Sequence, residues 1–150
     1  VDINALVTEL FGLVENHLIF QNVGLQKNLA ADLPPIQGDK SKLEQVMLNL
    51  FMNAGEAMAG HGTLSVITRQ NAQGAVEIRI SDTGPGIHPD HLPRLFDPFF
   101  TTKEVGRGIG LGLSVSYGII QQHRGRIYVD ATGVIGTTFV IELPALKVTS

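Results

Sequence analysis

The 150-residue sequence contains no cysteine, and this absence excludes several kinds of chemistry. Without thiols the chain cannot use a cysteine nucleophile, a disulfide framework or a zinc site with cysteine ligands, and it fits a reducing compartment. The sequence also lacks an excess of basic residues, since 11 Lys and Arg stand against 14 Asp and Glu for a net charge of −3. We therefore expect no general surface for duplex nucleic acid or an anionic membrane, and any polyanion should bind at a local site.

Long apolar runs are absent as well. None approaches membrane-spanning length, and the N-terminus shows neither a signal-peptide pattern nor an initiator methionine, so we expect a piece of a longer protein. A hydrophobic content of 43% in a chain of this size is enough to fill one core. We expect residues 1–150 to form a single domain.

The spacing of the apolar residues predicts the elements of that domain. Intervals of three and four residues predict helices at 3–20, from Asp39 or Ser41 to 59–60, and at 113–123. Alternation predicts strands near 23–29 and at 62–68, 75–81, 126–130 and 137–143. This order is not a regular βαβ alternation, which argues against a doubly wound dinucleotide fold. We expect an α/β two-layer sandwich, in which three main helices cover one face of a mixed, mostly antiparallel sheet of about five strands.

Residues 48–58, LNLFMNAGEAM, place Asn49, Asn53 and Glu56 on one stripe beside the apolar face of the second helix. Burying an amide without partners costs a few kcal/mol, so the pair needs an explanation. One explanation is that both amides bond to neighbouring backbone. The other is that they line a cleft, where their neutral oxygens would suit Mg²⁺, a hard cation that takes its remaining ligands from phosphates and water.

The stretch DTGPG follows a strand whose parity points Asp82 inward with Val76, Ile78 and Ile80. It reads either as a good turn or as a ligand site. In the second interpretation the Asp82 carboxylate accepts a hydrogen bond from a donor such as a purine amino group, and the glycines let the ligand lie against the backbone.

Residues 83–112 form a glycine-rich stretch that is too long for an ordinary connection. Its end, GRGIGLGLSVSYG, leads bare backbone N–H groups into a helix N-terminus, which favours anion binding. The spacing matches neither the P-loop nor the Rossmann pattern. Lys103 and Arg107 add local positive charge, although a mobile surface loop with solvated cations would show the same composition.

Together these motifs resemble the catalytic ATP-binding domain of a bacterial sensor histidine kinase. This domain belongs to the Bergerat-type ATPase group, with the ATP-hydrolysing part of DNA gyrase, the mismatch-repair MutL protein and the large heat-shock chaperone. The resemblance covers nearly the whole chain and rests on five motifs in order: EQVMLNLFMNAGEAM (44–58), SDTGPGI (81–87), LFDPFFTTK (95–103), GRGIGLGL (106–113) and GTTFVIELP (136–144).

The resemblance implies roles for individual residues. Asn49, Asn53 and Lys103 would be catalytic, with Asn53 as the magnesium ligand and Asn49 beside the phosphates. Asp82 would accept from the adenine amino group, and Thr137 would reach the same ring through water. The other expected nucleotide contacts are Ala57, Gly84, Gly86, Ile87, Arg107, Gly108, Gly110, Leu111 and Gly112. The glycines from Gly106 to Gly112 would form an ATP lid, and Phe96, Phe99 and Phe100 would contact partner helices.

One substitution bears on the reaction. Hydrolysing members of the group commonly carry a Glu at the position of Asn49, and an amide cannot act as the base that deprotonates water. The resemblance therefore favours transfer of the γ-phosphoryl group of ATP to a histidine. Alternatives are an ATP-hydrolysing module, or a regulatory module that acts through nucleotide binding or phosphorylates serine.

The acceptor itself is expected elsewhere. The five histidines, His17, His61, His88, His91 and His123, do not stand in the acceptor motif of the family. The implied partners are the dimerisation and phosphoacceptor helical hairpin of the same kinase and a downstream response regulator. We expect a monomeric, cytoplasmic fragment of a homodimeric kinase, whose full length could be anchored in the inner membrane.

Overall fold

The computed structural model describes residues 1–59, 61–86, 96, 110–132 and 136–146, of which 111, 112, 131 and 132 are described by backbone only. Its elements are α1 (Ile3–Val14), a 3₁₀ helix η1 (Leu18–Phe20), β1 (Val23–Asn28), α2 (Lys40–Ala57), β2 (Gly62–Gln70), β3 (Val76–Asp82), α3 (Gly110–Gln122), β4 (Arg126–Thr132) and β5 (Thr137–Leu143).

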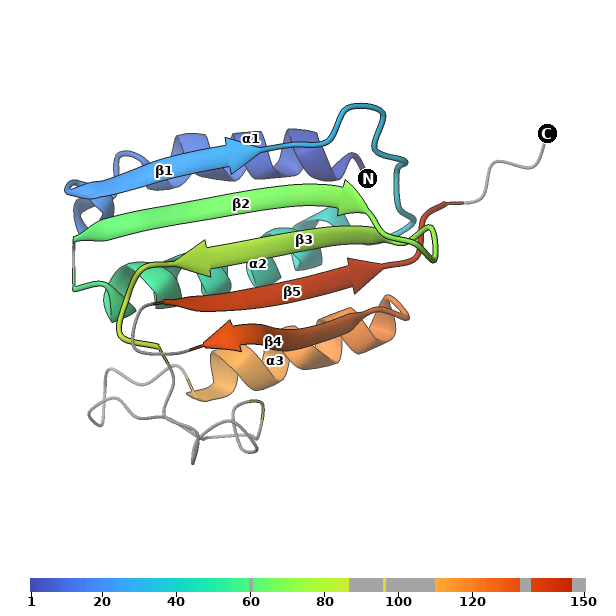
Figure 1. Cartoon of the computed structure of the whole chain (residues 1–150). Helices are drawn as coiled ribbons and strands as arrows, with labels where there is room; N and C mark the ends of the chain where they lie inside the picture. Colours follow the sequence, from blue (N-terminus) through green and yellow to red (C-terminus); the bar gives the residue numbers. More distant parts are fainter. Residues whose placement is uncertain (60, 87–95, 97–109, 133–135, 147–150) are drawn as a thin grey trace.

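The five strands form one sheet in the order β1-β2-β3-β5-β4, in which β1 and β2 are parallel and the other pairs antiparallel. All three α-helices lie on the same face of this sheet (Figure 1). The predicted two-layer sandwich with a mixed, mostly antiparallel sheet is therefore confirmed. None of the helices in the described ranges is long and apolar enough to cross a membrane.

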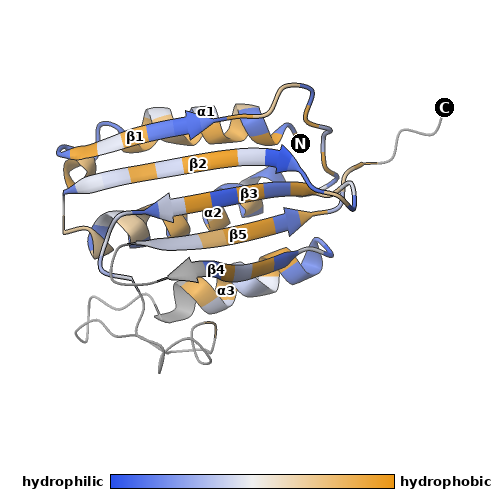
Figure 2. Cartoon of the chain, in the orientation of Figure 1, coloured by the Kyte–Doolittle hydropathy of each residue, from blue (hydrophilic) through white to orange (hydrophobic). Residues whose placement is uncertain are grey.

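The core fills the space between the two layers. Hydrophobic and hydrophilic residues alternate along the strands (Figure 2), and the side chains that face the helices are almost fully buried, such as Val66, Ile78 and Ile141. From the helical side, the rings of Phe11 on α1 and Phe51 on α2 meet edge to face, with centroids 5.5 Å apart. This packing fixes α2 across the middle of the sheet.

The first helix ends earlier than its sequence pattern predicts. We expected a helix over 3–20, but α1 stops at Val14 and the chain turns into η1, where Nδ1 of His17 accepts from the Ile19 N–H at 3.2 Å. This turn buries Phe20 to 3% exposure, and its ring comes close enough to α2 that only a glycine fits at Gly55. Tertiary packing therefore outweighs the helical periodicity here.

The helices that carry the predicted site are joined at one end by a histidine. Asp39 caps α2 by accepting from the Lys42 N–H at 3.2 Å, as one of the two predicted starts requires. His123, after α3, accepts the Asp39 N–H on Nε2 at 3.0 Å, and its Nδ1 lies 2.8 Å from the Ile119 carbonyl oxygen. The ring therefore ties the end of α3 to the start of α2.

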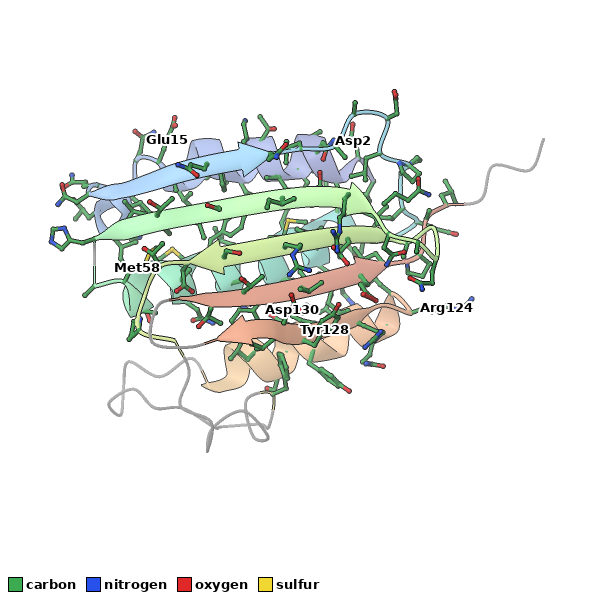
Figure 3. The ribbon with its side chains drawn as sticks, viewed as in Figure 1. Asp2, Glu15, Met58, Arg124, Tyr128 and Asp130 are labelled. Atoms are coloured by element: carbon green, nitrogen blue, oxygen red, sulfur yellow. The ribbon has the colours of Figure 1, made fainter. Side chains whose placement is uncertain are left out.

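The opposite face of the sheet is polar. Glu77 is only 3% exposed there and pairs with Arg69 and Arg79, and Arg79 also pairs with Asp130. Tyr128 and Asp130 project from β4 on this side (Figure 3). Because the charges are paired with one another, this face is compatible with solvent.

Candidate functional site

The predicted site residues gather at one end of the molecule, which we call the site end. The C-terminal end of α2, the end of β3, the start of α3 and the start of β5 all lie there (Figure 1). They bring Asn49, Asn53, Ala57, Asp82, Gly84, Gly86, Gly110, Leu111, Gly112 and Thr137 to the same region of the fold.

Asp82 is the last residue of β3 and pairs in register with Thr137, the first residue of β5. It shares the inward parity of Val76, Ile78 and Ile80, as predicted, and is half-buried. Burial raises the pKa of Asp82 above its ordinary value of 3.8, while hydrogen bonds from the Gly84 and Thr137 backbone N–H groups oppose the rise. Within the described residues Asp82 forms no ion pair, so its carboxylate is held by neutral backbone donors alone.

Glycines let three segments meet around Asp82. A Cβ on Gly84 would lie 3.2 Å from the Ala57 carbonyl oxygen at the end of α2. A Cβ on Gly136 would lie 2.4 Å from the Asp82 carbonyl oxygen, and the Gly136 N–H donates to the Gly84 carbonyl at 2.5 Å. Any side chain at these two positions would push the strand ends away from α2, so the glycines define the walls of the site.

Asn49 and Asn53 lie one turn apart on α2 and are both half-buried, whereas Glu56 is exposed. Nδ2 of Asn49 donates to Oγ of Ser116, a fully buried residue of α3, at 3.4 Å. Our sequence interpretation did not include Ser116. The available signal was a hydroxyl on the buried stripe of that helix, which continues through Ile119 and Ile120.

The donor set suits a cation that brings its own ligands. Among the described residues there is no cluster of three or more His, Cys, Asp or Glu that could hold a metal. Two half-buried amides do not form a protein cage for a metal, but they fit Mg²⁺ bound through substrate phosphates and water, with one or two protein oxygens.

Phe96 is the one described residue of the predicted aromatic motif. Its ring packs against Tyr117 on α3 and Phe139 on β5, with centroid distances of 5.5 and 6.4 Å. Ile87, Phe99, Phe100, Lys103, Gly106, Arg107 and Gly108 lie outside the described residues, as do His88 and His91.

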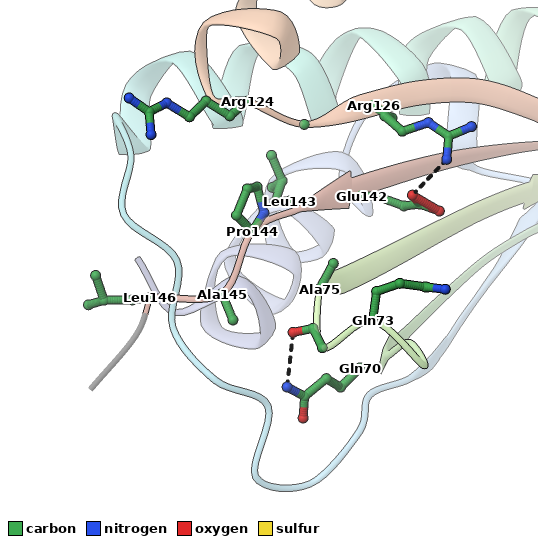
Figure 4. Close-up of a pocket in the computed structure, with 12 residues that line it drawn as sticks. Gln70, Gln73, Ala75, Arg124, Arg126, Glu142, Leu143, Pro144, Ala145 and Leu146 are labelled. Atoms are coloured by element: carbon green, nitrogen blue, oxygen red, sulfur yellow. Dashed lines mark hydrogen bonds and ion pairs between the residues drawn. The ribbon is translucent and has the colours of Figure 1, made fainter. Parts of the chain in front are cut away.

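A groove of about 460 Å³ lies at the other end of the sheet (Figure 4). It is lined by the β2–β3 turn, by Arg124 and Arg126, and by the residues at and after the end of β5. Arg126 pairs there with Glu142 at 3.4 Å, and Gln70 donates to the Gly74 carbonyl at 3.0 Å. Since β5 runs from Thr137 to Leu143, this groove is separated from Asp82 by the length of the strand.

Comparison with known proteins agrees with this arrangement. The family model for histidine kinase-, DNA gyrase B- and HSP90-like ATPases matches residues 38–147. The sensor histidine kinase ZraS of Escherichia coli strain K12 is 40% identical over 144 residues, which are 96% of this chain and 30% of ZraS. The sensor kinase CckA of Brucella abortus strain 2308 is 43% identical over 143 residues, 86% of this chain and 15% of CckA. The chain spans less than a third of either relative.

Solved structures share the fold. The nucleotide-free catalytic domain of the histidine kinase ThkA matches with a TM-score of 0.84 and 29% identity, covering 97% of this chain and 93% of that one. Full-length ShkA in complex with AMPPNP matches with a TM-score of 0.86 and 27% identity, covering 100% of this chain and 31% of ShkA.

Proposed function

Because this chain belongs to the family of histidine kinase-, DNA gyrase B- and HSP90-like ATPases, we propose that it binds Mg-ATP and donates the γ-phosphoryl group to a histidine of a separate dimerisation and phosphoacceptor hairpin. In this proposal the chain is the catalytic domain of a two-component kinase, and a response regulator receives the phosphoryl group next. The reaction consumes cellular ATP, so the domain would act on the cytoplasmic side.

The observation that carries the proposal is the environment of Asp82. A half-buried carboxylate that accepts only from backbone N–H groups has lone pairs left for a ligand donor. The exocyclic amino group of adenine is such a donor, whereas guanine presents a carbonyl oxygen at the same position. Asp82 would therefore select ATP over GTP, and the buried Thr137 beside it would contribute to the same pocket.

The amides of α2 would act at the phosphate end. Asn53 would hold Mg²⁺, which when bound supplies positive charge to the phosphates. Asn49, one turn away, would orient this end of the nucleotide, and it cannot serve as a base toward water. A neutral histidine nitrogen needs no deprotonation before it attacks, so transfer would rest on positioning and charge neutralisation. Lys103 and Arg107 remain predicted contributors to that neutralisation.

Radiolabel transfer tests the proposal. The chain is incubated with γ-labelled ATP, Mg²⁺ and the acceptor hairpin of the same kinase. We expect label on the hairpin that is lost in acid, because phosphohistidine is acid-labile. A hairpin with its histidine replaced by alanine is the matched control and should stay unlabelled. Acid-stable label would instead identify a serine kinase, and phosphate release without an acceptor would identify a hydrolysing module.

A further inference from the structure

Ser116 is a fully buried hydroxyl in the second turn of α3. Its neighbours Val115 and Tyr117 are each 41% exposed, so Ser116 lies on the opposite side of the helix, where α3 packs against α2. There it accepts the hydrogen bond from Nδ2 of Asn49. The contact joins residues 67 positions apart and connects the helix that follows the predicted ATP lid to the helix that carries both asparagines.

Few polar side chains in the described residues are as deeply buried. Besides Ser116 they are Thr68, Glu77 and Thr137. Thr68 and Glu77 belong to networks on other parts of the sheet, with Asn4 and with two arginines respectively. Ser116 instead contacts a residue predicted to be at the phosphate end of the nucleotide.

Packing alone does not explain a serine at this position. Alanine would fill nearly the same volume, has the higher helix propensity, and would bury no hydroxyl. A serine that is retained despite these costs has to be explained by what its oxygen contacts. In this structure that contact is Asn49.

We propose that Ser116 is a positioning residue that holds the Asn49 amide in the orientation needed at the Mg-ATP phosphates. The two ends of an amide are nearly equal in shape and opposite in function, since the nitrogen donates and the oxygen accepts. By accepting from Nδ2, the Ser116 hydroxyl fixes which end of Asn49 points toward α3 and leaves Oδ1 for the other side. This inference rests on the proposed function, and it adds a dependence of the phosphate end on the placement of α3.

The test is a double-mutant cycle on ATP binding. Dissociation constants for ATP are measured by calorimetry, with excess Mg²⁺ and with a chelator, for the wild type, Ser116→Ala, Asn49→Ala and the double variant. Loss of one neutral hydrogen bond predicts that Ser116→Ala weakens Mg-ATP binding about three- to tenfold. Affinity in the chelator should change less than twofold, because Asp82 and the base-binding end are untouched.

The cycle separates positioning from general loosening. If Ser116 acts through Asn49, removing its hydroxyl in the Asn49→Ala background should have no further effect. Asn53→Ala is the positive control for loss of the magnesium-dependent part, and Gln121→Ala, an exposed change on the same helix, is the neutral control. Thermal melts should show all variants folded.

Two results would overturn the inference. In one, Ser116→Ala lowers the affinity equally with and without Mg²⁺, which indicates a structural role. In the other, Ser116→Ala binds Mg-ATP as the wild type does. A wild type that binds no ATP under either condition would refute the proposed function as well, so the two failures are distinguishable.

Discussion

At the scale of single residues, Asp82 shows fold stability and proposed ligand recognition acting in opposite directions. Its pKa is raised in the fold, first of all by burial, so the folded state prefers the protonated carboxyl. Between the unfolded value near 3.8 and the higher folded value, the folded state binds more protons than the unfolded state. The contribution of Asp82 to stability therefore falls as the pH rises through that window, and at neutral pH the ionised carboxylate opposes folding of the empty site.

Asp82→Asn should consequently separate binding from stability. The amide oxygen can still accept from the Gly84 N–H, but it is a weaker acceptor for the adenine amino group. A hydrogen bond to a charged group is worth about 1.5 to 3 kcal/mol, so we expect ATP affinity to fall roughly ten- to a hundredfold. Calorimetry with ATP and GTP should show that the variant has lost most of the preference for ATP.

The melting temperature of the same variant without nucleotide provides the control. It should be equal to or above that of the wild type at neutral pH, and the stability of the variant should lack the dependence on pH above 3.8 that Asp82 confers. An Asp82→Asn protein that melts earlier while keeping the ATP-to-GTP ratio would make Asp82 a turn residue only.

Ala59 gives a second prediction at this scale. It follows α2 with a φ of +52°, a left-handed conformation at a position where helices usually place glycine. The strain of about 1–2 kcal/mol is partly offset by the extra freedom that a glycine has in the unfolded chain, so Ala59→Gly should stabilise by about 0.5–1 kcal/mol. Chemical denaturation measures this. Ala5→Gly, in the regular part of α1, is the matched control and should destabilise by about 0.5–1 kcal/mol.

The Ala59 case also shows why some of the structure could not be predicted. The sequence Ala59-Gly60 marks the end of the helix correctly, yet its pattern would assign the left-handed position to the glycine. Strand parity, by contrast, placed Asp82 and Thr137 on the inward face without error, because a period of two leaves no choice once the neighbouring apolar residues are known. The functional roles of these residues stay predictions.

At the scale of elements, the existence and order of the helices and strands followed from apolar periodicity, while contacts between elements did not. The early end of α1 depends on Phe20 reaching Gly55, and the contact of Ser116 depends on α3 lying beside α2. Both join residues far apart in the chain, about which local spacing carries no information. The same holds for the connection between α1 and the sheet.

That connection is made by Thr68 of β2, which is 2% exposed. Its Oγ1 accepts the Ala30 N–H at 3.0 Å and donates to Oδ1 of Asn4 at 2.7 Å, while Nδ2 of Asn4 donates to the Ala30 carbonyl at 2.7 Å. Thr68→Val keeps the shape and leaves two polar groups unsatisfied, which should cost about 1–3 kcal/mol of unfolding free energy in denaturant melts.

Thr63→Val on the same strand is the matched control. The Thr63 hydroxyl makes no hydrogen bond to a described residue, so this change should stay within about 0.5 kcal/mol of the wild type. Equal effects of the two valines would contradict the assignment of the cost to the Asn4–Thr68–Ala30 network.

At the scale of the whole molecule, the folded unit is larger than the part that matches the family model. The match begins at residue 38, but α1 already contributes a fully buried stripe to the core, comprising Ile3, Leu6, Val7, Leu10, Phe11 and Val14. β1 adds the parallel edge of the sheet. The site is carried by α2, α3, β3 and β5, yet α2 is held in place from the far side by α1.

We therefore expect a chain restricted to residues 38–150 to lose its cooperative fold. Removing α1 and β1 exposes the α1-facing side of α2, including Phe51, and the edge of β2, an apolar loss that the remaining core cannot offset. Within the intact chain the same argument predicts that Leu10→Ala, at a residue 1% exposed, costs about 2–5 kcal/mol, whereas Leu13→Ala, at a residue 63% exposed, is close to neutral. Denaturant melts of the three proteins, with ATP binding as a second readout, test the point. A cooperative melt and wild-type ATP affinity for 38–150 would show that α1 is dispensable for the site.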